Sequence, residues 1–161
     1  MSVDLSVMLH RFRAMSAIFI EVVDSAPNLE RDEFLASLNR ALAELYSSAL
    51  YLPAAEPETA DVDAAPFASD EFVALRDSLQ RKFGPLDIYW GTFDSTEKSE
   101  PYQGSLAGDI SEIYFDLKEN RQLGEKGITR ADLIWELRES FREHWGRHAA
   151  GALKAIYDLH L

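Results

Sequence analysis

The spacing of the apolar residues is the feature that most constrains the fold of this chain. Apolar residues recur in steps of three and four along much of the sequence. One series opens the chain, and a second lies between Pro27-Asn28 and Pro53. Their members are Leu5, Met8, Phe12, Met15, Phe19 and Val22, followed by Leu35, Leu38, Leu42, Leu45, Ala49 and Leu52. Steps of three and four place side chains on one face of an α-helix. The pattern predicts two long amphipathic helices that pack antiparallel.

The same periodicity predicts three further helices. The third begins at Ser69 and ends at Gly84-Pro85, the fourth begins at Ser105, and the fifth begins at Thr129 and runs to near the C-terminus. Serine and threonine commonly cap helix starts, and glycine commonly follows helix ends. We therefore expect an all-α fold, an antiparallel bundle of about five helices that forms a single domain over residues 1–161.

Two connecting segments interrupt the helical pattern. Residues 53–68 are rich in proline, alanine and acidic residues, and this composition predicts a mobile surface loop. Residues 85–104 contain four aromatic residues, Trp90 among them, between glycines and prolines. We expect a long aromatic-rich loop there, with two interpretations open. Its aromatic side chains plug the end of the bundle, or they form a lid or rim over a binding site.

The charge and the absence of cysteine exclude several functional classes. The chain has 28 acidic and 16 basic residues, a net charge of −12, which disfavours nucleic acid and anionic membranes as partners. It has no cysteine, so thiolate metal sites and disulfides are excluded, and a bound metal would need histidine and carboxylate ligands. The sequence shows neither a signal peptide nor an apolar run of about 20 residues, so we expect a cytoplasmic protein.

The motif at residues 143–148, EHWGRH, is the strongest candidate for a functional site. The i, i+4 spacing places His144 and His148 on one side of a helix, and Trp145 falls on its inner face. The motif lacks the glutamate of a HExxH metalloprotease. With helix ends near residues 120 and 129, a rise of about 1.5 Å per residue makes Asp109 a plausible neighbour and leaves Asp116 about 16 Å short of His144.

Three interpretations of the histidine pair stay open. In the favoured one the residues are structural: Asp109 or Glu112 pairs with Arg138, and the histidines bond to loop carbonyls. In the second, His144, His148 and Asp109 bind a divalent metal. In the third, a metal-free pocket contains a titrating histidine. The other acidic residues of this helix, such as Asp132, are expected on a solvated outer face.

Two segments resemble a bacterial family that is defined only as a domain of unknown function. Residues 105–118, SLAGDISEIYFDLK, are similar to its acidic SLxDDLxDIYxDL helix, and residues 134–157 are similar to its C-terminal helix with HWGxH. The matching residues are Ser105, Leu106, Asp109, Ile113, Tyr114, Asp116, Leu117, Lys118, Trp135, Phe141, His144, Trp145, Gly146, His148, Ala152 and Leu153. Gly108, Glu112 and Phe115 depart from the pattern. The resemblance covers nearly the whole chain, and it implies a helical fold without implying an activity.

These observations favour a non-catalytic protein- or ligand-binding module over an enzyme. No cofactor is expected, and the partner is a protein, a small ligand or a second copy of the chain. The candidate binding residues are Trp90, Asp109, Arg138, His144, Trp145 and His148. The alternative is a divalent-metal-binding helical-bundle hydrolase that uses the histidines of HWGRH. An exposed apolar patch would favour the first function, and convergence of both imidazoles on one ion would favour the second.

Overall fold

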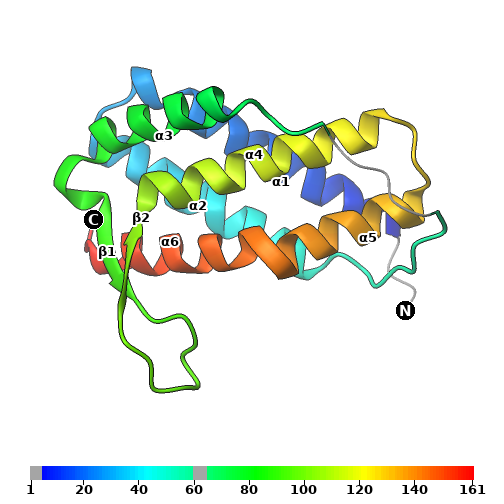
Figure 1. Ribbon diagram of the computed structural model, residues 1–161. Helices are drawn as coiled ribbons and strands as arrows, with labels where there is room; N and C mark the ends of the chain where they lie inside the picture. The colour runs from blue at the N-terminus through cyan, green and yellow to red at the C-terminus, as the bar shows by residue number, and fades with distance from the viewer. Residues whose placement is uncertain (1–4, 60–64) are drawn as a thin grey trace.

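The computed structural model describes residues 5–59 and 65–161, which form the predicted antiparallel helical bundle (Figure 1). Its first four helices are α1 (Leu5–Asp24), α2 (Arg31–Leu50), α3 (Ser69–Phe83) and α4 (Leu106–Glu125). The last rod consists of α5 (Arg130–Ser140), a π-helical turn (Phe141–Trp145) and α6 (Gly146–Asp158). Two 3₁₀ turns, Ala26–Asn28 and Gly84–Leu86, follow α1 and α3. The all-α prediction of about five helical rods is confirmed.

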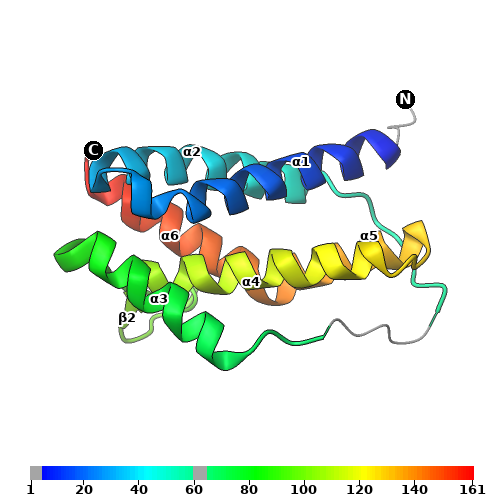
Figure 2. The same ribbon diagram turned by 90° about the horizontal axis from the view of Figure 1, so that it is seen from above.

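The helices enclose one apolar core. Seen from above, α1 and α2 lie side by side, α3 lies beside α4, and α6 crosses obliquely between these pairs (Figure 2). All of these elements contribute fully buried side chains, including Phe12, Leu38, Leu42, Phe83, Ile110 and Trp145. Burial of such side chains supplies the main driving force for folding. Among the described residues, no helix has the length and apolar character to cross a membrane.

Residues 85–104 form a β-hairpin rather than the irregular loop that the sequence suggested. Strand β1 (Ile88–Gly91) pairs antiparallel with β2 (Tyr102–Ser105), and Trp90 lies opposite Gln103. The sequence Ile-Tyr-Trp consists of residues that favour strands. The hairpin extends away from the helices (Figure 1), and Trp90 and Phe93 are 69% and 79% exposed. Neither side chain plugs the end of the bundle.

A buried carboxylate attaches the hairpin to the start of α4. Asp87, just before β1, accepts hydrogen bonds from the Ala107 amide at 2.7 Å and from the Ser105 hydroxyl at 3.0 Å. The Ser105 hydroxyl in turn accepts from the Gly108 amide at 3.0 Å, as a helix cap should. These bonds satisfy amide groups that have no partner within the helix. The predicted start of the fourth helix at Ser105 is thus confirmed.

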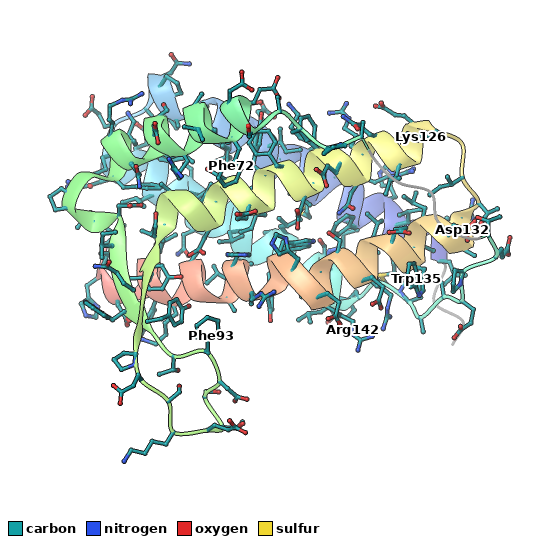
Figure 3. The ribbon with its side chains drawn as sticks, viewed as in Figure 1. Phe72, Phe93, Lys126, Asp132, Trp135 and Arg142 are labelled. Atoms are coloured by element: carbon teal, nitrogen blue, oxygen red, sulfur yellow. The ribbon has the colours of Figure 1, made fainter. Side chains whose placement is uncertain are left out.

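Asp132 is buried, although its position in the sequence suggested a solvated outer face. Its carboxylate accepts hydrogen bonds from the Thr59 hydroxyl and amide, the Glu58 amide and the Thr129 hydroxyl. The bonds from Thr59 contribute most to lowering the pKa of Asp132 to about 2. Asp132, on α5 (Figure 3), thus fixes residues 58 and 59, inside the 53–68 segment, against that helix. Residues 60–64 lie outside the described residues, and the mobility of the segment stays a prediction.

The π-helical turn interrupts the regular course of the last rod. At its end the Gly146 amide donates to the Phe141 carbonyl, an i→i+5 hydrogen bond in place of the α-helical i→i+4 bond. A Cβ atom on Gly146 would lie 2.5 Å from that carbonyl oxygen and 3.0 Å from the Phe141 ring. The extra residue changes the direction in which side chains after the turn point. Glycine is therefore required where the chain passes from His144 to His148.

We predict that Gly146→Ala lowers the free energy of unfolding by about 2 kcal/mol or more, because the added methyl group collides with backbone as well as with a ring. Chemical denaturation measures the change. Gly108→Ala is the matched control, since its Cβ would meet Ser105 no closer than 3.4 Å, and we expect a change of less than about 1 kcal/mol. Equal effects of the two substitutions would contradict the conclusion that the π-helical turn requires glycine at position 146.

Candidate functional site

Two carboxylates of α4 face two imidazoles of the last rod. Asp109 and Asp116 are seven residues apart on α4, nearly two full turns, and therefore share a face. His144 lies in the π-helical turn and His148 in the first turn of α6. We refer to these four residues as the imidazole–carboxylate cluster.

Each histidine pairs with its own carboxylate. The His144 Nδ1 atom lies 2.6 Å from Asp116 Oδ2, and the His148 Nδ1 atom lies 2.8 Å from Asp109 Oδ1. An ionised carboxylate only accepts hydrogen bonds, so each Nδ1 carries a proton and donates it. The two ring centroids are 5.0 Å apart in an edge-to-face arrangement. The Nε2 atoms are left to accept a proton, bind a metal ion or contact a ligand.

A tyrosine of the hairpin completes the cluster. The Tyr89 hydroxyl donates a hydrogen bond to the second carboxylate oxygen of Asp109, Oδ2, at 2.6 Å. Burial, together with the neighbouring Asp109, raises the pKa of Tyr89 far above its ordinary value, so the hydroxyl keeps its proton. Asp109 therefore joins three elements: α4 through its backbone, β1 through Tyr89 and α6 through His148.

Two glycines make room for the tyrosine. A Cβ atom on Gly104, opposite Tyr89 in the hairpin, would lie 2.3 Å from the tyrosine ring. A Cβ atom on Gly151 of α6 would lie 2.7 Å from the tyrosine hydroxyl. Larger residues at these positions would force the ring away from Asp109. The hairpin thus packs against α6 only because both surfaces lack side chains at the contact.

The electrostatic environments of Asp116 and of the acidic residues beside it on α4 differ. Burial raises the pKa of Asp116, and the hydrogen bond and charge of His144 oppose this rise. Burial also raises the pKa of Glu119, with a further contribution from Asp116. Glu112 is half-exposed and lies 3.9 Å from His144 Nε2. Negative charge thus accumulates on this face of α4, and His144 is the neighbouring group that can balance it.

The structure brings Asp109 beside the histidines, as the sequence suggested, but it pairs His144 with Asp116, which the axial estimate had excluded. That estimate was wrong because α4 continues to Glu125 instead of ending near residue 120. Asp116 is therefore about 7.5 Å further from the turn than was assumed. The last rod also runs obliquely to α4, which changes the residues of the two rods that lie opposite each other (Figure 2).

The predicted partner of Arg138 was also wrong. Its guanidinium donates to the Leu52 carbonyl at 2.6 Å and fixes the end of α2, whereas the carboxylates of Asp109 and Glu112 face the histidines. The histidines accordingly bond to carboxylates and not to loop carbonyls. Such contacts depend on the relative register of helices, which apolar periodicity leaves open.

The two tryptophans among the candidate residues have opposite environments. Trp145 is fully buried, packs against Phe12 and Phe141, and its indole N–H has no hydrogen-bond partner in the described structure. A partner protein cannot reach it without unfolding the core. Trp90 lies on the hairpin and is largely exposed. Of the two, Trp90 alone is placed to contact a partner.

The metal hypothesis requires three converging ligands. Both carboxylate oxygens of Asp109 already accept hydrogen bonds, one from His148 and one from Tyr89. Across residues 5–59 and 65–161 no group of three or more histidine, aspartate or glutamate side chains has the geometry to hold an ion. His144, His148 and Asp109 lie close together, but as hydrogen-bonded pairs and not as a common ligand set.

The chain belongs to a family described as a domain of unknown function (DUF5063), whose model matches residues 3–161. The crystal structure of protein BF1032 from Bacteroides fragilis is similar, with a TM-score of 0.79 and 21% sequence identity. The similarity covers 94% of this chain and 91% of that one, and it shows a shared fold. No curated protein matches the chain in sequence. The resemblance seen in the acidic helix and the HWGxH motif is thus confirmed at the level of the family.

We predict that Asp116→Asn leaves the protein as stable as the wild type at pH 7, or more stable by up to about 1 kcal/mol. Asparagine keeps an oxygen that accepts from His144 Nδ1, and it removes the unfavourable burial of charge that raises the pKa of Asp116. Because the folded-state pKa exceeds the ordinary value of 3.8, the wild type should lose stability as the pH rises through that folded pKa. Thermal melts from pH 4 to pH 7 measure both effects.

Glu112→Gln is the control for this experiment, because it removes an acidic group one turn away that is 38% exposed. Its stability should follow that of the wild type at every pH. A loss of more than about 1 kcal/mol in Asp116→Asn at pH 7 would mean that the ion pair with His144 outweighs the burial of the carboxylate, contrary to our interpretation.

Proposed function

We propose that this member of the DUF5063 family is a non-catalytic protein-binding module, and that its partner is a protein with a basic and partly apolar surface. The partner contacts the outer face of the β1–β2 hairpin. The observation that carries the proposal is the exposure of Ile88 and Trp90, 47% and 69%, on a hairpin that extends beyond the helices (Figure 1). Exposed tryptophan is frequent among residues that dominate binding energy in protein interfaces.

The distribution of side chains over the two faces of the hairpin supports this assignment. Side chains alternate between the faces of a strand, so Tyr89 points to α6 while Ile88 and Trp90 point outward. Outward positions of a solvated strand are usually polar. Two large apolar residues at both outward positions of the Ile88–Trp90 segment therefore favour a surface that is covered by a partner.

The connection between the strands supports a basic partner. Residues 92–101 contain three acidic residues and one lysine, and the chain as a whole has a net charge of −12. A field of this sign attracts basic surfaces and repels acidic ones. Phe93, in the same connection, packs against Tyr102 yet stays mostly exposed, outside the helical bundle (Figure 3). An apolar centre with an acidic rim is complementary to an apolar centre with a basic rim.

In this proposal the imidazole–carboxylate cluster positions the binding surface and takes no part in a reaction. Tyr89 and Asp109 hold the inner face of the hairpin against α6, so the outer face is presented in a fixed orientation. A rigid surface loses less conformational entropy on binding than a mobile one. His148, hydrogen-bonded to Asp109, keeps that carboxylate in place.

A divalent-metal site at His144 and His148 is the second candidate, and one observation favours it. Metal-binding histidines usually donate their other ring nitrogen to a carboxylate, as both histidines do here. A third and a fourth ligand would have to come from water, a substrate or Glu112. Stoichiometric zinc in untagged protein that is lost in His144→Ala would support this candidate. If the untagged protein contained no zinc, the binding module would be the remaining candidate.

We expect a photo-crosslinker, benzoylphenylalanine, in place of Phe93 to form an adduct with a second protein in living cells. The adduct should disappear when Trp90→Ser is added, because that substitution removes the apolar centre without touching the core. The crosslinked peptide of the partner should be rich in lysine and arginine. Mass spectrometry of the purified adduct identifies it.

The same crosslinker in place of Ile18 is the matched control, since Ile18 is a large apolar residue of α1 that is 45% exposed. Three results would overturn the proposal: adducts of equal yield from positions 18 and 93, an adduct that persists in Trp90→Ser, or no adduct at all. An adduct with the mass of two copies of this chain would assign the surface to self-association instead.

A further inference from the structure

A groove of about 420 Å³ lies between α1, α4 and α5. Helix α5 lies at the end of the bundle opposite the hairpin (Figure 1). The volume of the groove falls within the range of small-molecule sites. The apolar residues that line it are buried side chains from all three helices: Phe12, Ile20, Leu117, Leu133 and Leu137. Eight residues of α1 and eight of α4 separate the ends of the lining, so the groove is about 12 Å long.

Small side chains keep this groove open. Ala17 lines it from α1 and is exposed, and Gly124 lines it from α4. A Cβ atom on Gly124 would lie 3.1 Å from a guanidinium nitrogen of Arg13. The Arg13 side chain therefore reaches from α1 across the mouth of the groove to α4, above the apolar residues.

The charge at the mouth is opposite in sign to that of the protein. The charged residues of the lining are Arg13, Arg121 and Glu125, in a chain whose net charge is −12. Arg121 and Glu125 form an exposed ion pair at 3.6 Å. Arg13 has no acidic partner among residues 5–59 and 65–161, although the whole chain has 28 acidic and 16 basic residues. No carboxylate of the described residues therefore competes with an outside anion for its guanidinium.

Polar groups also lie beside the apolar residues. The Asn120 side chain, which is buried, lines the groove and donates to the Ser140 hydroxyl at a long 3.3 Å. Ser16 lines it from α1. A carboxylate is recognised best by a guanidinium with additional hydrogen-bond donors nearby. The groove thus combines a buried apolar surface with a positively charged opening.

We propose that this groove binds a small organic acid, with its hydrocarbon body against Phe12, Leu133 and Leu137 and its carboxylate at Arg13. This site is independent of the protein-binding function of the hairpin, because the two surfaces share no residue. Decanoate, a straight-chain carboxylate, is a suitable probe. Decyltrimethylammonium has a hydrocarbon chain one carbon longer and a positive charge, and the overall charge of the protein would favour it over decanoate.

Isothermal titration calorimetry on the full chain tests the proposal. Decanoate should bind with one-to-one stoichiometry, and decyltrimethylammonium should not compete for the site. Arg13→Gln should weaken decanoate binding about tenfold or more, because a charge-assisted hydrogen bond is lost. Ala17→Leu should abolish binding, since the larger side chain fills the groove from an exposed position, and both variants should keep the melting temperature of the wild type.

Arg11→Gln is the matched control. It removes the same charge from the same helix, but Arg11 faces Glu44 at 4.0 Å and the Tyr51 ring at 5.5 Å, outside the groove. Binding should change less than about twofold. The proposal is overturned by any of three results: no binding of decanoate to the wild type at millimolar concentration, equal binding of the cationic probe, or equal effects of Arg13→Gln and Arg11→Gln.

Discussion

The hydrogen-bonded chain Tyr89–Asp109–His148 is the interaction on which the placement of the hairpin against the helices depends. A buried carboxylate is stable only when donors surround it, and Asp109 receives one donor from the hairpin and one from α6. Loss of these partners would leave a buried charge without donors, so the two hydrogen bonds stabilise the contact of α4 with β1 and α6. The glycine contacts under Tyr89 and the π-helical turn before His148 bring both donors within reach.

The hairpin and the groove, the two proposed binding sites, have opposite character. The hairpin presents apolar residues within an acidic surround, whereas the groove presents apolar residues beneath an arginine that lacks an acidic partner among the described residues. The helical core connects them, and both α4 and the last rod contribute to each region. A protein partner at one end and a small acid at the other would therefore bind the same rigid body without competing for residues.

Apolar periodicity and capping residues predict the helices because both act within one helix. The helix caps at Ser105 and Thr129 follow from local hydrogen bonds that the sequence makes visible. Contacts between helices depend on the relative register of the helices. Placing the end of α4 about five residues too early shifted the expected register by about 7.5 Å. The partners of Asp116 and Arg138 were missed for this reason, whereas Asp132 bonds to Glu58 and Thr59 of the 53–68 segment, whose path helical periodicity does not specify. The strand-forming residues Ile88, Tyr89 and Trp90 are the local signal in the sequence that predicts a strand of the hairpin.

Amide hydrogen exchange in a Tyr89→Phe variant tests the central interaction most directly. That substitution removes the hydroxyl that donates to Asp109 and retains the ring that packs between Gly104 and Gly151. Our account predicts that the amides of β1 and β2 exchange faster than in the wild type, by about tenfold for a loss of roughly 1.4 kcal/mol, while amides in the centres of α1 and α2 are unchanged. Unchanged exchange in the hairpin, or equal acceleration throughout the bundle, would show that the chain of hydrogen bonds does not hold the hairpin in place.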